Sequence, residues 1–462
     1  MTSADGIVEL SPVRRNLSVV ALLLTMLMTN IDSSIVNVAL PQLSRDLKTT
    51  PSDVVWVVTA FLLAVSCAIP AMSGLADRIG RKRMFVIGTP IFTLASLACA
   101  LSPSLGWLVA GRVAQGVSAA MLFAVVIPIY RRLFPPARLG TILGLNAMTV
   151  AIGISAGPAL GGLILANLSW PWLFLINLPI GLVATTLGLL FIPHRVPARS
   201  PFDTVGALAA AAAIACFLLG VHQLAATSTL WFAALLLAAC AVFVVLLVRV
   251  ERRAERPVIP LALFNGKFNL AVLTAFWSFF GQGVAFVALP FLFQTAYHAT
   301  PLESALLFTP WPLVIVFVAP IAGRLADRYP SERLAVIGLS IFTAGLLSLS
   351  LLGAHPPIWQ VLASTAVTGL GFGVFQSPNN RDMMSAAPMH YASSAAGILN
   401  LNRSLAQSAG AGAVSMALVL AGASAGSLSS QASAANGALV VAVIGAAISV
   451  VVSVIKLRGA RV

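Results

Sequence analysis

A single carboxylate lies within the first long apolar stretch of the chain, in MTNIDSSIVNVALPQ (28–42). Asp32 is the only charged residue between Arg15 and Arg45. An acid at the centre of a hydrocarbon layer costs about 2.5–3.5 kcal/mol, so it is expected to face a cavity or a partner. Burial favours its neutral form, and an acid that gains and loses a proton inside a protein can couple proton movement to transport. The alternative is a structural acid that is satisfied by neighbouring Asn and Ser side chains.

Two arginines also fall inside apolar stretches. Counted along the helix from Arg15 at 1.5 Å per residue, Asp32 lies about 25 Å into the membrane span. Arg112 is expected at a similar depth in its own helix. Arg112 could pair with Asp32 and modulate its affinity for protons, or it could extend to the outer interface. Asn400, Arg403 and Gln407 share one helix face by their spacing. They are expected either to line a cavity or to hydrogen-bond between helices.

The elements that position these residues must cross a membrane. The chain is 59% hydrophobic and 9% charged, whereas soluble domains carry roughly a quarter charged residues. The net charge of +14 would suggest a nucleic-acid partner in a soluble protein. Here basic loops that orient a membrane protein explain the charge better, and no nucleic acid is expected.

Apolar runs of about 20 residues predict fourteen transmembrane helices. They are 17–41, 53–73, 84–102, 106–130, 140–165, 171–192, 204–224, 230–249, 268–295, 302–323, 333–353, 358–380, 394–421 and 434–455. Most Lys and Arg residues lie in loops on the side of the two termini, and only Arg45 and Lys48 lie in the opposite loops. This asymmetry predicts that both termini are in the cytoplasm. We expect a multi-pass protein of the bacterial inner membrane.

An internal repeat organises the helices. LADR occurs at 75–78 and again at 325–328, each time at the cytoplasmic end of the second helix of a group of six. Parallel repeats of this kind are a feature of transporters. We therefore expect an all-α membrane protein with two six-helix bundles in a pseudo-twofold repeat and a two-helix insertion. The expected limits are 1–200, 201–256 and 257–462.

Enzymatic chemistry is not expected. The chain has no G-x-x-x-x-G-K-[ST] phosphate loop and no nucleophile–base pair. Its His, Cys and acidic residues form no cluster with metal-ligand spacing, so neither a metal nor a cofactor is predicted.

Five segments match motifs of one family, in the same order along the chain. They are DSSIVNVALP (32–41), SGLADRIGRKR (73–83), RVAQG (112–116), GISAGPALGG (153–162) and the WPW and NLP segments (170–172 and 177–179). Together they resemble the major facilitator superfamily in its fourteen-helix drug:proton antiporter branch. Ser34 stands for the family's Thr, Ser73 for its Gly and Pro171 for its Arg, and Pro330 replaces a glycine in the second LADR copy.

The resemblance implies roles for three groups of residues. Asp32 and Arg112 would serve proton coupling. A gate loop would stabilise the outward-facing state through Asp77, Arg78, Gly80, Arg81, Asp327 and Arg328. The simpler alternative for its arginines is that they only mark cytoplasmic loops, as in any membrane protein. An antiporter motif comprises Gly153, Gly157, Pro158, Gly161 and Gly162. Its glycines repeat every four residues, which predicts a smooth face for close packing, expected against the other half.

Polar and aromatic residues in the helices are candidates for a substrate cavity, although each alone is more often packing. They are Asn37, Gln115, Asn146, Trp277, Phe280, Gln282, Phe375, Gln376, Asn400, Arg403 and Gln407. Amphipathic compounds suit such linings.

The leading hypothesis is a monomeric proton-coupled transporter that exports amphipathic, cationic drugs or biocides by alternating access. Its partners would be protons, a small-molecule substrate and the lipid bilayer. The alternative is a carrier of another metabolite, an exporter or a symporter, with a substrate of different charge. One acid, Asp32, faces two arginines in the predicted interior, so a monocation, a zwitterion or an anion all remain open.

Overall fold

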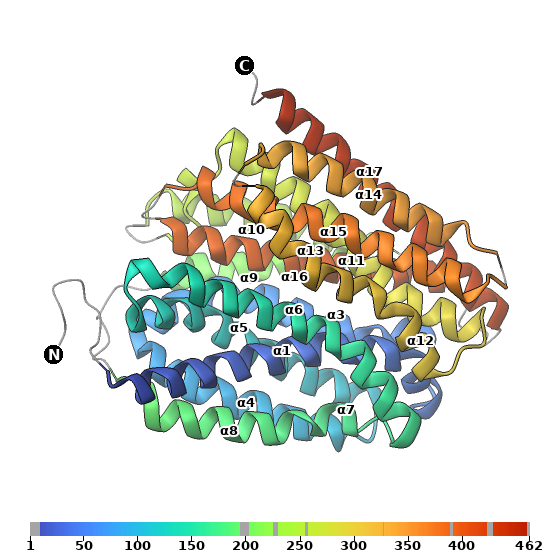
Figure 1. Cartoon of the computed structure of the whole chain (residues 1–462), viewed down its shortest axis with the longest axis horizontal. Coiled ribbons are helices and arrows are strands. Elements are labelled where there is room, and N and C mark those ends of the chain that lie inside the picture. The colour runs from blue at the N-terminus through green and yellow to red at the C-terminus, as the bar shows by residue number, and fades with distance from the viewer. Residues whose placement is uncertain are drawn as a thin grey trace.

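Long helices that run side by side make up the protein in a computed structural model (Figure 1). The structure describes residues 10–194, 203–224, 230–254, 257–326, 328–353, 355–388, 391–422 and 428–459. Within these ranges the regular elements are helices, with no strand. The predicted all-α fold is confirmed.

The first half contains α1 to α8. Their bounds are α1 Pro12–Asp46, α2 Pro51–Val54, α3 Trp56–Ile79, α4 Arg81–Ala100, α5 Leu105–Leu133, α6 Pro136–Asn167, α7 Trp172–Leu175 and α8 Asn177–Phe191. Local signals explain the helix starts: Ser11 caps α1 by accepting a hydrogen bond from the backbone N–H of Arg14, and Pro12 occupies the first turn.

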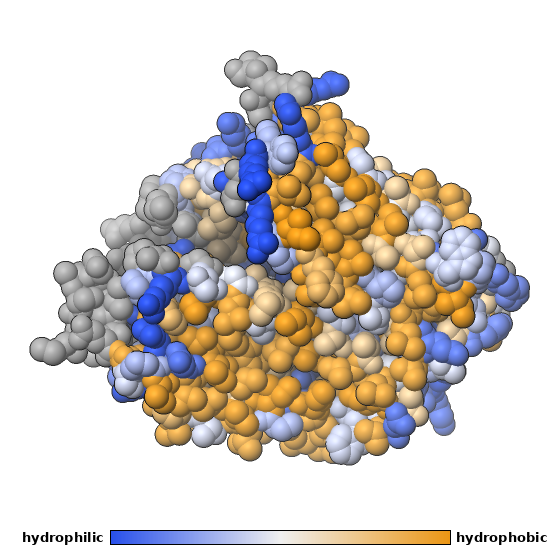
Figure 2. Space-filling view, viewed as in Figure 1, coloured by the Kyte–Doolittle hydropathy of each residue, from blue (hydrophilic) through white to orange (hydrophobic). Residues whose placement is uncertain are grey.

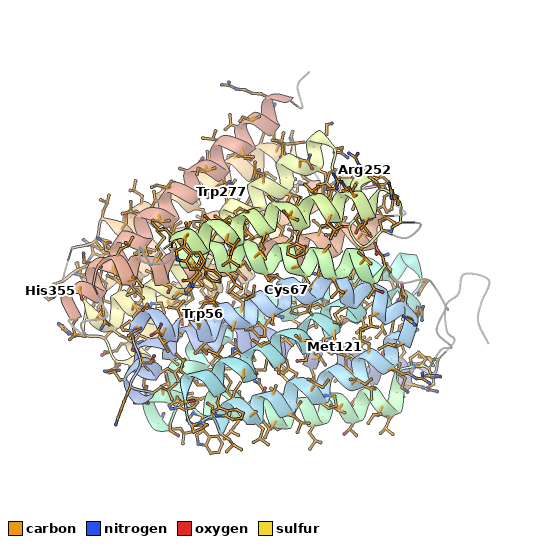
Figure 3. The ribbon with its side chains drawn as sticks, turned by 180° about the vertical axis from the view of Figure 1, so that it is seen from behind. Trp56, Cys67, Met121, Arg252, Trp277 and His355 are labelled. Atoms are coloured by element: carbon orange, nitrogen blue, oxygen red, sulfur yellow. The ribbon has the colours of Figure 1, made fainter. Side chains whose placement is uncertain are left out.

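Two helices follow the first half, α9 (Thr204–Gln223) and α10 (Leu230–Glu251). They pack on each other, and α9 also contacts α3. The ring of Trp56 on α3 lies 4.4 Å from that of His222 on α9, and Figure 3 labels Trp56 beside the paired helices. Exposed apolar residues such as Trp231 and Val242 cover α10, as expected for a helix that faces lipid.

The second half contains a short 3₁₀ helix (Leu261–Leu263) and α11 to α17. Their bounds are α11 Gly266–Thr295, α12 Pro301–Phe308, α13 Pro310–Leu325, α14 Ser331–Ser350, α15 Ile358–Ala386, α16 Ala392–Leu420 and α17 Leu428–Gly459. Thr300 and Glu303 form a capping box at the start of α12, which satisfies backbone N–H groups that the helix leaves free.

Thirteen spans in the described residues are long and apolar enough to cross a membrane. Helix α16 has 29 residues and is long enough to be a further span, although it carries the polar residues Asn400, Arg403 and Gln407. The fourteen predicted spans therefore all correspond to helices. An apolar band covers the face seen in Figure 2, and hydrophilic residues gather toward its ends.

Helices α1 to α8 lie together in the lower part of Figure 1, and α11 to α17 lie in the upper part. This arrangement is compatible with two six-helix halves and a two-helix insertion. The limits at residues 200 and 256 stay a prediction, and both fall outside the described residues.

The halves meet at the end of the molecule that lies away from the N-terminus. There the Gln294 side chain donates to the Val38 carbonyl (2.8 Å), and the Ser415 hydroxyl donates to the Ser52 carbonyl (3.1 Å). Near the middle of the helices, the hydroxyl of Ser66 on α3 donates to that of Ser404 on α16 (2.9 Å). Because α1 begins at the opposite end, the molecule is closed at the end far from its N-terminus.

Candidate functional site

Asp32 lies at the centre of a buried polar network. Its side chain is fully buried and accepts hydrogen bonds from three others. Arg112 Nη1 lies 2.5 Å from Oδ2, while Gln115 Nε2 (2.9 Å) and Asn177 Nδ2 (2.7 Å) both donate to Oδ1. The acid is on α1, Arg112 and Gln115 are on α5, and Asn177 begins α8. Asp32 therefore faces the interior of the first half, not the boundary between the halves.

A second layer of hydrogen bonds orients these donors. Ser96 on α4 accepts from both Gln115 (2.8 Å) and Asn177 (3.2 Å). Gln115 Oε1 accepts from Arg112 Nη1 (2.8 Å). All of these side chains are fully buried, so the network excludes water from the acid in this conformation. Sequence reasoning missed Ser96 and used Asn177 only as part of the NLP motif.

The Arg112 guanidinium is held on several sides. Its Nε donates to the Val57 carbonyl (2.9 Å), and its charge lies 4.4 Å from the centre of the Phe61 ring and 5.9 Å from that of Phe174. Cation–π contacts of this kind strengthen when they are desolvated. Its Nη2 has no hydrogen-bond partner among the described residues. The network can thus hold a carboxylate as an ion pair, and it can lose that pair if the acid is protonated.

A second polar group lies on α16, at the boundary between the halves. Arg403 is half-buried, and its Nη2 lies 3.4 Å from Oδ1 of Asn30 on α1. One turn on, Gln407 donates to Gln282 Oε1 on α11 (2.9 Å). The predicted polar face of this helix therefore contacts both halves.

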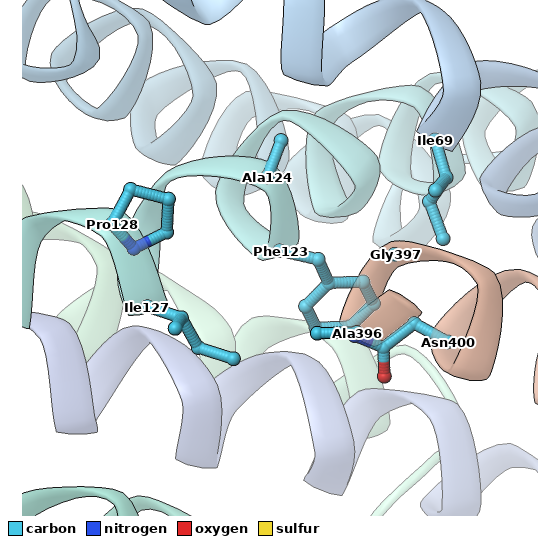
Figure 4. Close-up of a pocket in the computed structure, with 8 residues that line it drawn as sticks. All are labelled: Ile69, Phe123, Ala124, Ile127, Pro128, Ala396, Gly397 and Asn400. Carbon is cyan, nitrogen blue, oxygen red and sulfur yellow. The ribbon is translucent and has the colours of Figure 1, made fainter. Parts of the chain in front are cut away.

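A pocket lies between the halves on the side of the N-terminus, and Asn400 reaches it (Figure 4). Helices α3 and α5 contribute one wall, and α16 contributes the other. The lining residues are Ile69, Phe123, Ala124, Ile127, Pro128, Ala396, Gly397 and Asn400. The pocket lining is mostly apolar, and in this conformation the pocket is too small to enclose a whole amphipathic compound.

The other cavity candidates lie apart from these two groups. Asn37 donates to the Ser34 carbonyl of its own helix (3.2 Å), and Asn146 accepts from the Tyr130 hydroxyl (3.4 Å). In the second half, the ring centres of Trp277 and Phe280 lie 5.6 Å apart, and Gln376 is half-buried. Phe375 is buried against Phe372, 5.9 Å away between ring centres. None of these residues lines the pocket in Figure 4.

The gate loop lies between α3 and α4. Asp77 accepts from Arg81 Nη2 (2.9 Å), and Arg81 Nη1 also donates to the Pro128 carbonyl on α5 (3.4 Å). Gly80 joins the two helices at φ 98°, a conformation that side-chain-bearing residues rarely adopt. Arg78 and Arg328 are exposed, and Asp327 lies outside the described residues.

The glycines of the antiporter motif pack α6 against α1. A Cβ on Gly153 would lie 2.9 Å from Asn30 Cβ, one on Gly157 would overlap Ser34, and one on Gly161 would lie 2.9 Å from the Ile35 carbonyl oxygen. The expectation that this face packs on the other half is therefore wrong for these three glycines, because periodicity identifies a smooth face but not its neighbour.

Gly162 makes the contact with the other half. A Cβ there would lie 2.5 Å from Ala305 Cβ on α12. Two turns earlier on the same helix, Ser155 donates to the Pro312 carbonyl on α13 (3.1 Å). Pro158 falls inside α6, where it removes one backbone hydrogen bond.

The chain is similar to known transporters. Its sequence matches the Major Facilitator Superfamily over residues 22–411. It is 37% identical over 394 residues to the uncharacterised transporter YebQ of Escherichia coli, covering 85% of this chain and 86% of YebQ. The riboflavin transporter RibZ of Clostridioides difficile is 33% identical, covering 78% and 79%. A multidrug resistance protein B homologue of Mycobacterium tuberculosis is 29% identical, covering 86% and 74%.

Solved structures share the fold. A bacterial homologue of the human lysosomal transporter Spinster, in an inward-facing and unoccupied conformation, aligns with a TM-score of 0.70 at 15% identity. The alignment covers 97% of this chain and 98% of that one.

Proposed function

Because the chain belongs to the major facilitator superfamily, whose members carry small molecules across membranes, we propose that it couples proton entry to the export of amphipathic organic compounds. The chain is a multi-pass membrane transporter and not an enzyme. We place it in the bacterial inner membrane, as a monomer with both termini in the cytoplasm. Beyond this, we propose three properties: coupling to protons, transport in the direction of export and a drug-like substrate.

The observation that carries the proposal is the fully buried pair of Asp32 and Arg112. An acid with this environment has two distinct states. As a carboxylate it accepts hydrogen bonds from Arg112, Gln115 and Asn177, which lie on two neighbouring helices. Once protonated it would lose the ion pair with Arg112, and the packing of α1, α5 and α8 around it would change. A change in helix packing that follows protonation is what alternating access requires.

The pattern of contacts between the halves supports the same cycle. The halves are joined at the end away from the N-terminus, and a pocket separates them at the other end. With cytoplasmic termini, as the basic residues predict, the molecule is open to the cytoplasm. An exporter binds its substrate in such a state.

A second candidate is a carrier for one defined metabolite. The 33% identity to a protein named as a riboflavin transporter favours it. Riboflavin therefore belongs in any substrate panel.

The test is proton flux in proteoliposomes that enclose a pH-sensitive dye. A proton gradient is imposed, and riboflavin and a panel of aromatic anions, cations and neutral compounds are added in turn. We expect at least one compound to dissipate the gradient with wild type, and Asp32→Asn to abolish this flux. Asp46→Asn is the matched control, because Asp46 is exposed at the end of the same helix. If Asp32→Asn moves protons with substrate as wild type does, Asp32 does not couple them.

A further inference from the structure

We infer that Arg403 binds an anionic group of the substrate, so that the cargo is an amphipathic organic anion with a carboxylate-like group beside an apolar ring system. This inference rests on the proposed function as an exporter of amphipathic compounds, but it does not depend on how protons are coupled.

Arg403 has no acidic partner among the described residues. It sits near the middle of α16, and the ion pairs of the described residues involve other side chains. Among the described residues its side chain makes one long hydrogen bond, 3.4 Å to the neutral Asn30 side chain. An intramembrane arginine is normally paired with an acid or with backbone carbonyls. A half-buried arginine without such a partner is available to a ligand.

Asp32 cannot supply the missing charge. It follows Asn30 by two residues on α1, which corresponds to a rotation of about 200° around a helix. Asn30 therefore faces α16, while Asp32 faces α5 and α8. Asp32 is also enclosed by three donors, one of which is the Arg112 guanidinium. The boundary between the halves consequently carries a net positive charge at this depth.

The surroundings of Arg403 also include apolar side chains. Asn400 precedes Arg403 by one turn on the same face of α16 and lines the apolar pocket with Phe123 and Ile127. We expect this small pocket to widen when a compound binds with its ring system there and its anionic group directed toward Arg403. Arginine offers a planar fork of donors that suits a carboxylate and binds it through two parallel hydrogen bonds.

The sign of the charge has a consequence for the driving force. Exchange of one proton for one monovalent cation moves no net charge, so a membrane potential does not drive it. Exchange of one inward proton for one outward anion moves two charges in the favourable direction, so an inside-negative potential drives export as well.

The test uses three probes with one ring system: naphthylacetate, naphthylacetamide and naphthylethylammonium, which are anionic, neutral and cationic. Binding to the purified full-length protein in detergent is measured by equilibrium dialysis. We expect naphthylacetate to bind most tightly. Arg403→Gln should weaken its binding by at least about tenfold, as expected for loss of a charged hydrogen bond, and Arg403→Lys should weaken it less. Naphthylacetamide binding should change little in either variant, which also reports that the variants are folded.

Arg249→Gln is the control for removal of a positive charge, because Arg249 is exposed on the lipid-facing helix α10. It should leave all three affinities unchanged. The inference is overturned if naphthylethylammonium binds wild type as tightly as naphthylacetate, or if Arg403→Gln leaves naphthylacetate binding unchanged or weakens all three probes equally.

The two proposals fail in distinguishable ways. If naphthylacetate binds through Arg403 but no compound moves protons, the coupling is wrong and the anion site stands. If protons move with naphthylethylammonium and not with naphthylacetate, the coupling stands and the anion site is wrong. As a second readout, valinomycin and a potassium gradient impose an inside-negative potential without a pH gradient. Wild-type efflux of naphthylacetate should then accelerate, and efflux by Arg403→Gln should not.

Discussion

Asp32 and Arg112 depend on each other because both are fully buried. Removing one member of a buried ion pair leaves the other charge without compensation, which typically costs about 3–5 kcal/mol. We therefore expect Asp32→Asn to lower the free energy of unfolding by about this amount. The double variant Asp32→Asn/Arg112→Gln should recover much of the loss, because neither charge of this pair remains.

Thermal unfolding of the purified single and double variants measures this difference. Asp46→Asn again serves as the control, because that exposed acid makes one 3.4 Å contact, with Gln42, among the described residues. A double variant that is less stable than Asp32→Asn would mean that Arg112 is stabilised mainly by Val57 and Phe61, and not by the acid.

The charged residues at the centre of this network could be predicted from the sequence, but the uncharged polar residues around them could not. An Asp and an Arg inside apolar runs are rare enough to be noticed, and their similar depth allowed a pair to be anticipated. Ser96 carries no such signal, because a lone serine is common in a membrane helix. Its role arises only when α4, α5 and α8 bring three polar side chains to one point.

At the scale of the element, Gly80 is required by backbone geometry. It ends α3 and precedes α4 at φ 98° and ψ 132°, where a Cβ is strained whatever space surrounds it. Backbone strain of this kind costs about 1–3 kcal/mol. We expect Gly80→Ala to destabilise the protein by a similar amount and to shift the orientation of α3 relative to α4.

The measurement is again thermal unfolding, together with the transport rate. Gly106→Ala is the matched control, because a Cβ at Gly106 meets nothing within 4 Å. If the two variants unfold at the same temperature, the turn between α3 and α4 relaxes without cost and the conformation of Gly80 is not a constraint.

Periodicity and apolar length predicted the helices well, but they could not predict every break or neighbour. The expected span 302–323 is two helices, α12 and α13, with the junction at Thr309 and Pro310. Proline in the first turn of α13 marks this junction locally. The glycines at 153, 157 and 161 predicted a smooth face, yet only the assembled bundle places that face on α1.

At the scale of the whole molecule, Gly162 contributes to closure between the halves. A Cβ there would approach Ala305 Cβ to 2.5 Å and the Pro301 carbonyl oxygen to 3.0 Å. Overpacking of a tight contact costs about 1–3 kcal/mol. Since this contact belongs to the closed end, Gly162→Ala should destabilise the state seen here relative to a state in which that end opens. A penalty of that size changes the ratio of the two states by about 5–150-fold.

Electron spin resonance distances between labels at Arg45 on α1 and Leu306 on α12 report this equilibrium, because both residues are exposed on opposite halves near the closed end. The four native cysteines are first replaced. We expect a longer-distance population to grow in Gly162→Ala. Gly144→Ala should leave the distribution unchanged, because Gly144 lies on the same helix α6 with open space around its Cβ position. A distribution that does not change in Gly162→Ala would mean that α6 and α12 separate by sliding along each other, so that the contact at Gly162 persists in both states.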